Sequence, residues 1–490
     1  MSRVTRRGFI KSSLAMAGAT FVISGTKSSG QVLGSNETIL IGVAGINGRG
    51  GSHIGAWSGM KDVRIAYLVD IDARLFKGRS ASLEKKSGTA PNCVQDIRKA
   101  LEDKNLDAIS IATPNHWHSL MTIWACQAGK DVYVEKPLCH NVHEGRIAVE
   151  TARKYNRVVQ HGTQGRSGNL GLVIQELAKQ GIYGKLLIAR GLCYKPRPSI
   201  GFKETKEPPA DVDFNIWLGP APLQPYHENL VHYNWHWFWD FGNGDIGNQG
   251  VHEMDKARWG LTGATGATLP KSVIAVGGRL GYKDQGQTPN TQISVLDYGP
   301  AQLMFEVRGL PSATGAKDMD KYFGQGIGDT YHFEKGVVAG NRFFPTGKTE
   351  GQPLPALELP EKGEDSHFRN FIEVMRTRKI ENLKADVLEA YLSCVPIHLT
   401  NISYRLGEEA PFNPKTKAFG DNKAAYEMLG RMEEHLTKNG IKLEETKYHV
   451  GKNLTFDPGT EKFTGDGAEQ ANELLTRKYR APFVVPDKVV

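Results

Sequence analysis

The stretch Gly42–Gly51 reads GVAGINGRGG and directly follows an apolar run that begins at Thr38. The spacing G-x-G-x-x-G of a dinucleotide-binding loop would place glycines at 45, 47 and 50, but position 47 is Asn. Such a loop indicates a nucleotide site only when a strand precedes it, a helix follows it and an acidic residue ends the next strand. The surrounding sequence therefore decides between a nucleotide site and a plain turn.

Short apolar runs and helical segments alternate along the first part of the chain. Runs rich in β-branched residues predict strands at 38–45, 63–70, 106–113, 131–137 and 157–162. Apolar residues at helical spacing predict helices between them at 72–87, 96–104, 116–128 and 142–156. This alternation is typical of right-handed βαβ units. We predict an α/β fold whose residues 37–162 form a Rossmann-like domain with a doubly wound parallel sheet.

The pattern changes after Gly162. Strand-like runs at 186–195, 272–282, 291–299 and 302–310 include neighbours joined by short turns without helices, which favours a mostly antiparallel sheet. Helices are predicted at 170–180, twice within 366–405, and at 422–439. We predict an α+β domain with an open sheet at 163–415, for substrate binding and oligomerisation. Residues 416–490 are expected to form a helix and a loop-rich tail that wraps the protein or contacts another subunit.

The sequence contains all three features that a nucleotide-binding glycine loop requires, namely the strand, the helix and the acidic residue. The run 38–45 supplies the strand, a helix is possible from Ser52 onward, and Asp70 ends the second strand at the spacing of a carboxylate that binds the adenosine ribose. Such a carboxylate repels a 2′-phosphate, which favours NAD over NADP, although the nearby Arg74 leaves NADP open. Asn47 is expected to adopt the left-handed backbone that Asn tolerates. The predicted cofactor contacts here are Gly45, Ile46, Asn47, Gly48, Arg49, Gly50 and Asp70.

Two further segments follow predicted strands and should lie at the same sheet edge. They are ATPNHWH at 112–118 and EKP at 135–137. With the loop and Asp70, these motifs make the chain similar over about 37–410 to the Gfo/Idh/MocA family, the oxidoreductases related to glucose–fructose oxidoreductase and inositol dehydrogenase. We expect additional cofactor contacts from Thr113, Pro114, Asn115, His118, Glu135 and Lys136.

Lys136 is the leading candidate for the catalytic residue. By itself, EKP also fits an edge strand that ends in a surface lysine and a proline. A lysine that is partly desolvated beside a nicotinamide cation has a lowered pKa and can exchange a proton with a substrate hydroxyl. The resemblance implies this role for Lys136, with a peptide bond after it that is often cis. Glu135 is expected to orient the cofactor edge.

A second set of candidates lies in the segment 242–255, GNGDIGNQGVHEMD. The family pattern D-x-G-x-H-x-x-D, aligned on His252 and Asp255, places Asn248 at its first Asp. If this segment is helical, the three side chains share one face. Asn248 cannot accept a proton but can hydrogen-bond a sugar hydroxyl, and Asp245 is a possible replacement for the missing carboxylate. Helix capping or core packing for His252, and capping or ion pairing for Asp255, remain alternatives.

The segment 232–240, HYNWHWFWD, is rich in aromatic side chains. Trp235 and His236 are candidates for substrate binding because aromatic faces stack on sugar rings. A core or dimer-interface cluster is an equally good interpretation. The histidine pairs of this chain lack a third ligand at supporting spacing, so we predict no metal.

Composition narrows the remaining classes. The 490 residues carry a net charge of +8 that is spread along the chain, which argues against nucleic-acid binding, and the five cysteines suggest no disulfide framework. Residues 1–35 contain the pair Arg6-Arg7 followed by an apolar stretch, which indicates a twin-arginine export signal or, alternatively, a disordered basic tail. We expect a periplasmic or exported protein without a membrane span after export, anchored if the signal stays uncleaved. The resemblance favours a homodimer or homotetramer packed through the open face of the C-terminal sheet.

Together these features predict an NAD(P)-dependent oxidoreductase that acts on a sugar, cyclitol or related polyol. Hydride passes between a substrate carbon and the nicotinamide, while Lys136, helped by His252, handles the hydroxyl proton. Two rivals remain. One is a glycoside hydrolase or lyase that oxidises a sugar carbon only transiently, and the other is a non-catalytic nucleotide or sugar sensor.

Overall fold

A parallel sheet of six strands forms the N-terminal domain in the computed structural model, which describes residues 38–360 and 366–489. The strand order is β3-β2-β1-β4-β5-β6, which confirms the doubly wound prediction. The strands are β1 (Ile39–Ala44), β2 (Val63–Val69), β3 (Asn92–Val94), β4 (Ala108–Ile111), β5 (Asp131–Val134) and β6 (Val159–His161). The chain reverses direction across the sheet between β1 and β4, and ligands of such folds bind at the carboxyl ends of strands beside this switch point.

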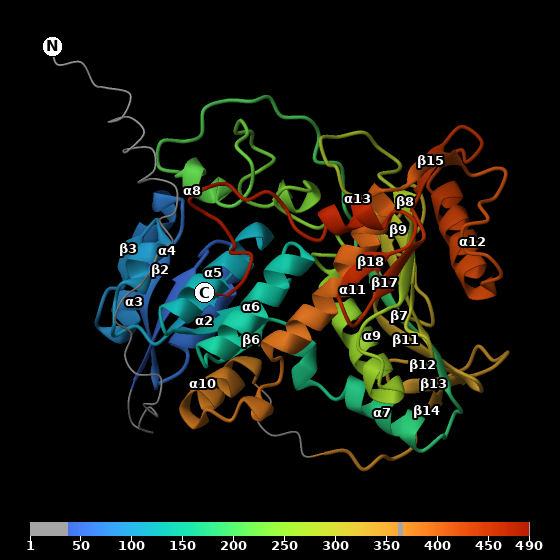
Figure 1. The fold of residues 1–490 in the computed structure, drawn as a ribbon, viewed down its shortest axis with the longest axis horizontal. Helices are drawn as coiled ribbons and strands as arrows, with labels where there is room; N and C mark the ends of the chain where they lie inside the picture. The colour runs from blue at the N-terminus through green and yellow to red at the C-terminus, as the bar shows by residue number, and fades with distance from the viewer. Residues whose placement is uncertain (1–37, 361–365, 490) are drawn as a thin grey trace.

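Helices cover both faces of this sheet. They are α2 (Arg49–Ser58), α3 (Phe76–Ser87), α4 (Ile97–Leu101), α5 (Asn115–Gln127) and α6 (Val142–Lys154), with a short 3₁₀ helix η1 (Ala73–Leu75). Trp57 of α2 and Leu83 of α3 pack on one face together with Phe371 of α10 (His367–Thr377). Figure 1 shows α10 beside the N-terminal domain, although it lies about 200 residues further along the chain. The apolar stripe of α10 therefore completes the Rossmann core from outside the predicted boundary.

A mostly antiparallel sheet of twelve strands forms the C-terminal domain, as predicted. Among the strands that the structure describes in this sheet, only β7 and β10 pair in parallel. The strands are β7 (Leu186–Tyr194), β8 (Ser272–Gly278), β9 (Thr291–Asp297), β10 (Gln302–Arg308), β11 (Ile327–Phe333), β12 (Gly336–Ala339), β13 (Arg342–Pro345), β14 (Gln352–Pro353), β15 (Glu408–Pro411), β16 (Lys447–Val450), β17 (Leu454–Asp457) and β18 (Lys462–Thr464). The prediction of a loop-rich tail is wrong for 447–464, since β16 and β17 pair with β8.

Three helices pack on one face of this sheet, namely α7 (Leu170–Lys179), α9 (Gly250–Thr265) and α11 (Val387–Arg405). The shorter segments are η2 (Gln164–Ser167), α8 (Phe214–Leu218), η3 (Asn234–Trp237), η4 (Ile380–Asn382) and α13 (Ala468–Glu473). In Figure 1 the segment around α8 lies over the N-terminal domain, and the C-terminal tail returns from the large sheet to the same domain. Within 38–360 and 366–489, no helix has the length and apolar character needed to cross a membrane.

Over β8–β10, the other face of the sheet is covered by α12 (Lys423–Lys438). Met428, Leu429 and Met432 of this helix pack against Val276 of β8 and Met304 of β10. The sequence-based expectation of a face left open for another subunit is therefore wrong over β8–β10. The apolar stripe of α12 removes from solvent the surface that a partner would otherwise cover.

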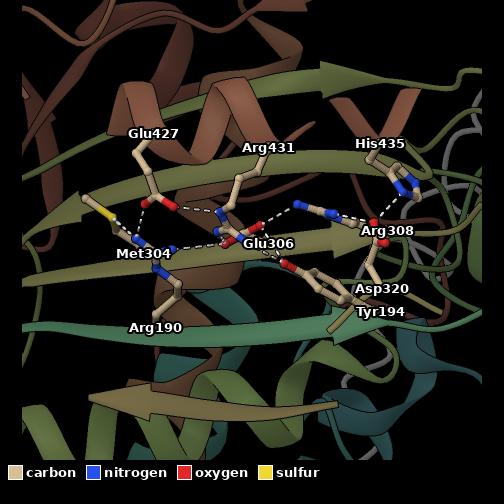
Figure 2. Close-up of polar contacts among 9 residues, drawn as sticks. All are labelled: Arg190, Tyr194, Met304, Glu306, Arg308, Asp320, Glu427, Arg431 and His435. Atoms are coloured by element: carbon tan, nitrogen blue, oxygen red, sulfur yellow. Dashed lines mark hydrogen bonds and ion pairs between the residues drawn. The ribbon is translucent and has the colours of Figure 1, made fainter. Parts of the chain in front are cut away.

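A buried ionic network ties α12 to the strands beneath it. Figure 2 shows Glu306 of β10 at its centre, in contact with Arg190, Arg308 and Arg431. Glu306 also accepts a hydrogen bond from the Tyr194 hydroxyl at 2.7 Å. Burial alone would raise the pKa of Glu306, but the surrounding guanidinium groups hold it below its ordinary value. The network therefore depends on an ionised carboxylate at Glu306.

The substitution Glu306→Gln is expected to lower the free energy of unfolding by roughly 3–5 kcal/mol, because it leaves buried guanidinium groups without their counter-charge. Chemical denaturation measures this loss. Since the folded-state pKa of Glu306 is depressed, the wild-type advantage is fully present above pH 4.5 and disappears as the pH falls through the folded pKa. The control is Glu434→Gln, which removes an exposed pair with Lys438 and should change stability little. Equal effects of the two substitutions would contradict this account.

Candidate functional site

A cavity of about 340 Å³ lies at the carboxyl edge of the parallel sheet. Its wall combines the glycine loop, the ends of β2, β4 and β5, and residues of the segment 216–236. Among the predicted site residues, the cavity is lined by Gly45, Asn47, Gly48, Arg49, Asp70, Thr113, Pro114, Asn115, His118, Glu135, Lys136, Trp235, His236 and Asn248. Ile46, Gly50, Asp245 and His252 lie outside its lining. Tertiary structure thus brings most of the predicted site to one place.

The glycine loop forms the turn without a left-handed Asn47. The positive φ angles belong to Gly45 (76°) and Gly48 (46°), so the prediction for Asn47 is wrong. A Cβ on Gly45 would lie 2.6 Å from the carbonyl oxygen of Ala112, whereas one on Gly48 would meet no atom within 4 Å. Helix α2 begins at Arg49, earlier than predicted, and no side chain caps it at Gly48. Its amino end is therefore open to an anionic group such as a pyrophosphate.

Asp70 occupies the position expected of a ribose-binding carboxylate. It accepts hydrogen bonds from the backbone N–H groups of Ile46 (2.8 Å) and Asp72 (3.0 Å), so Ile46 supports the site from behind. Burial raises the pKa of Asp70. Arg74 donates to both carboxylate oxygens of Asp72, at 2.7 and 2.6 Å. The Arg74 guanidinium, the candidate group for binding a 2′-phosphate, is already paired with Asp72, which fits NAD.

His118 connects the loops that follow β4 and β5 in the wall of the cavity. His118 lies between the carbonyl oxygens of Pro137 (2.6 Å) and Thr113 (2.8 Å). The buried amide nitrogen of Asn115 has no hydrogen-bond partner in the described part of the chain. An open cradle at Gly48, the carboxylate of Asp70 and this unpartnered amide fit a dinucleotide.

Glu135, in the wall of the cavity, connects the end of β5 to helix α2. Its Oε1 accepts from Arg49 Nε at 2.6 Å and lies 3.1 Å from His53 Nε2, which links β5 to α2. Burial opposes ionisation, but His53 and Arg49 hold the pKa of Glu135 well below its ordinary value. Sequence analysis missed His53, because nothing in the spacing of a helical histidine shows which strand end it will meet.

Lys136 is held by Asn248, the residue that replaces the first Asp of the family pattern. Its Nζ donates to the backbone oxygen of Asn248 at 2.9 Å and to the side-chain oxygen at 3.2 Å. Burial lowers the pKa of Lys136, and the negative charge of Glu135 partly offsets this shift. The Lys136–Pro137 peptide bond is cis. An amide at position 248 can therefore orient the lysine without competing with it for a proton.

The other members of this constellation do not share one helical face. The shared face required a helix through all three positions, but α9 begins at Gly250, so Asn248 lies in the preceding turn while His252 and Asp255 lie on the helix. Burial and the charge of Lys136 lower the pKa of His252 to about 4. The carboxylate of Asp255 binds Arg166 at 2.9 Å, and that of Asp245 binds Arg197 at 2.5 Å. The described residues contain no group of three or more side chains suited to a metal ion.

The aromatic segment divides between cavity and core. Trp235 and His236 stack with ring centroids 3.6 Å apart, and both line the cavity. Trp235 also packs in a buried cluster with Phe238 and Phe241, and Trp217 of this cluster lines the cavity as well. His236 Nδ1 lies 2.6 Å from the carbonyl oxygen of Tyr233, and burial holds the pKa of His236 well below its ordinary value. The neutral ring therefore donates from Nδ1 and keeps Nε2 as a proton acceptor.

The fold and the cavity define a two-domain, dinucleotide-binding protein with an oxidoreductase architecture. Residues 39–163 match the family model "Oxidoreductase family, NAD-binding Rossmann fold" of the Gfo/Idh/MocA proteins. Residues 200–276 match the model of their "C-terminal alpha/beta domain". These matches support assignment of the chain to the Gfo/Idh/MocA oxidoreductases, with NAD as the nucleotide of the Rossmann domain.

Similar proteins carry two kinds of name. A "Glycosyl hydrolase family 109 protein" of Shewanella sp. (strain W3-18-1) is 23% identical over 207 residues, which cover 38% of this chain and 45% of that protein. An "Alpha-N-acetylgalactosaminidase" of Shewanella oneidensis is 24% identical over 168 residues, covering 34% and 37%. The chain thus matches less than half the length of these curated relatives. The WlbA dehydrogenase of Bordetella pertussis, solved with NADH and UDP-GlcNAcA, shares the fold with a TM-score of 0.55 at 18% identity, over 75% of this chain and 97% of that one.

Proposed function

We propose that this protein uses NAD to oxidise a hydroxyl-bearing carbon of a sugar, cyclitol or related polyol. One observation carries the proposal: a single cavity is lined both by the dinucleotide residues and by Lys136, His236 and Trp235. A stacked aromatic pair offers an apolar surface to a sugar ring, and the lysine and histidine offer proton acceptors to its hydroxyl groups. The names of the curated relatives, which are glycosidases, support a sugar as the substrate.

The residues around the cavity suit the proton transfer that this oxidation needs. When bound, NAD supplies the acceptor for the hydride that leaves the substrate carbon. Neutral Lys136 takes the proton of the hydroxyl group, so that a carbonyl forms, and the two oxygens of Asn248 hold the resulting ammonium. His236 Nε2 offers a second acceptor to a neighbouring hydroxyl. The residues that would hold NAD are the loop 45–49, Asp70 and Asn115.

A substrate screen tests the proposal. The purified protein is incubated with glucose, galactose, N-acetylgalactosamine, myo-inositol and their p-nitrophenyl glycosides where these exist. Nucleotide absorbance near 340 nm and product identity are recorded together. We expect reduction of NAD with at least one of these compounds. Binding of NAD with neither reduction nor glycoside cleavage for any compound would favour the non-catalytic sensor.

A second candidate function is glycoside cleavage without net redox change, and the enclosure of the nucleotide site favours it. The segment 211–217, which we name the clasp, crosses the end of β2. The backbone of Ala73 donates to Asp211 (3.0 Å), and that of Asp213 donates to Ile71 (2.9 Å). His116 Nε2 lies 2.8 Å from the carbonyl oxygen of Trp217.

The clasp is reinforced by a side-chain contact beside the cavity. His232 Nε2 lies 3.0 Å from Asp72 Oδ2. A covered nucleotide leaves slowly, so the cofactor reduced in one half of the reaction remains to be reoxidised in the other. Retention of this kind also suits the proposed twin-arginine export. The predicted signal, residues 1–35, lies outside the described residues.

We propose a homodimer or homotetramer that associates through a surface other than the part of the sheet under α12.

Loosening the clasp is expected to accelerate loss of NAD. Ala73→Pro removes one clasp hydrogen bond, and proline is tolerated at the first position of a helix, here η1. His232→Ala removes the contact with Asp72. We expect the double variant to release NAD at least about 10-fold faster, since each hydrogen bond contributes roughly 1 kcal/mol. The time course of NAD loss from the loaded protein during dialysis measures the rate.

The control for this experiment is His143→Ala, which alters a histidine of α6 that contacts the carbonyl of Pro486 outside the cavity. It should leave the release rate unchanged. If wild-type protein loses its nucleotide as readily as the double variant, the clasp does not retain the cofactor. A net dehydrogenase would then be favoured over redox-neutral glycoside cleavage.

A further inference from the structure

We propose that Arg197 and Asp245 position Tyr233 as a hydrogen-bond donor to an oxygen atom of the sugar substrate. The inference rests on the proposed function and deepens it by assigning a further substrate-contacting group. Tyr233 lines the same cavity as Lys136, and about half of its surface (53%) is exposed. The sequence indicated Asp245 as a candidate base, but it gave no sign of Arg197 or Tyr233 or of a connection among the three residues.

The hydroxyl group of Tyr233 is prepared to donate. Its oxygen accepts a hydrogen bond from Arg197 Nη1 at 3.2 Å. A phenol oxygen that accepts from a guanidinium keeps its own proton for another acceptor, and the cation strengthens that donor. Since Tyr233 faces the cavity, the acceptor that fits this proton is a hydroxyl, glycosidic or carbonyl oxygen of a bound sugar.

The side chain of Arg197 is fixed by its contacts with Asp245 and Trp237. Its Nε and Nη2 donate to the two carboxylate oxygens of Asp245 at 2.9 and 2.5 Å. The guanidinium lies over the Trp237 ring, 5.0 Å from its centroid. With its side chain only 11% exposed, Arg197 keeps Nη1 directed at Tyr233. This bidentate geometry is typical of an arginine whose role is to fix the position of a neighbour.

Asp245 links this arrangement to the catalytic lysine. Its backbone oxygen accepts from the N–H groups of Asn248 (3.1 Å) and Gly250 (2.9 Å), and so holds the turn that presents Asn248 to Lys136. Its carboxylate also opposes the effect of burial on the pKa of Lys136. Because that carboxylate is buried, paired with Arg197 and outside the cavity lining, Asp245 is a positioning residue and not the replacement base considered from the sequence.

The test compares Tyr233→Phe, Asp245→Asn and the double variant in NAD-loaded protein. Binding of the compounds in the substrate screen is measured by calorimetry, and kcat/KM is measured as a function of pH. We expect Tyr233→Phe to weaken binding or kcat/KM about 10-fold. Asp245→Asn should cause a similar loss and also move the acid limb of the pH profile to lower pH, because the pKa of Lys136 falls further. The loss in the double variant should fall clearly short of the product of the two single losses.

The matched control is Asp255→Asn, which removes another buried carboxylate that binds an arginine in bidentate fashion, away from the cavity. It should lower thermal stability without moving the pH profile. Independent effects of the two substitutions, or an unchanged Tyr233→Phe, would overturn the inference. A sugar that binds without turnover would contradict the proposed function, while its Kd values would still test Tyr233. A wild-type protein that binds none of the compounds would overturn both.

Discussion

Replacement of Lys136 by methionine is expected to reduce turnover roughly 100- to 10,000-fold while NAD remains bound, which is the range that a general base contributes. Methionine approximates the apolar stem of lysine but lacks the amino group and cannot accept a proton. The nucleotide should stay because the residues that would hold it, the glycine loop, Asp70 and Asn115, are untouched. Single-turnover reduction of the bound NAD by the best substrate of the screen measures the loss.

The pH profile makes this prediction more specific. Lys136 must be neutral to accept the hydroxyl proton, so the rate of sugar oxidation should rise with pH through its pKa. Because burial lowers that pKa, the rise should occur below 10.5, the value of an ordinary lysine, and should be absent in the variant. The control is Lys256→Met, since Lys256 is a largely buried lysine that pairs with Asp329 at 2.7 Å outside the cavity lining. Equal losses in the two variants would point to general destabilisation instead of catalysis.

The substitution Gly50→Ala is expected to abolish tight NAD binding, with a loss of affinity of about 100-fold or more. A Cβ at this position would lie 1.8 Å from the carbonyl oxygen of Gly45, a backbone atom that cannot move without opening the loop. The third glycine of such loops permits the close approach of helix and strand, here α2 and β1. Titration of nucleotide-free protein with NAD measures the effect.

A neighbouring glycine provides the control for this experiment. Gly55 lies in the middle of α2, and a Cβ added there meets no atom within 4 Å. Gly55→Ala should therefore leave NAD binding intact and stabilise the helix by about 0.5–1 kcal/mol. If Gly50→Ala binds NAD as tightly as Gly55→Ala does, the loop does not need the close approach that the structure shows.

The two domains were predictable because local patterns determine them. Alternating apolar strands and amphipathic helices specify βαβ units, and the strand, the glycine loop and Asp70 have a fixed spacing along the chain. Strand β11 was missed for a physical reason. In β11 the polar residues Asp329 and Thr330 are buried, so the alternation of polar and apolar residues that marks a strand is absent.

Most residues of the candidate site were predicted from the sequence, but their geometry was predicted only in part. The positive φ angle was predicted for Asn47 but is found at the neighbouring Gly48, because glycine adopts such an angle at a lower cost in free energy. The sequence left open whether the segment around Asn248 is helical, and in the structure the turn held by the backbone oxygen of Asp245 precedes α9. Such choices depend on contacts with residues far along the chain, and those contacts leave no spacing signal.

The sequence by itself determined the Rossmann domain, the preference for NAD and the identity of Lys136 as the lysine at the sheet edge. These depend on residues within one βαβ unit or at the ends of adjacent parallel strands. Only the tertiary structure decided that α12 covers the large sheet over β8–β10, that the clasp crosses the end of β2, and that Arg197 joins Asp245 to Tyr233. Each of these is a contact between segments that local propensity leaves independent, and their pairing is decided by which apolar and charged surfaces fit together when the chain folds.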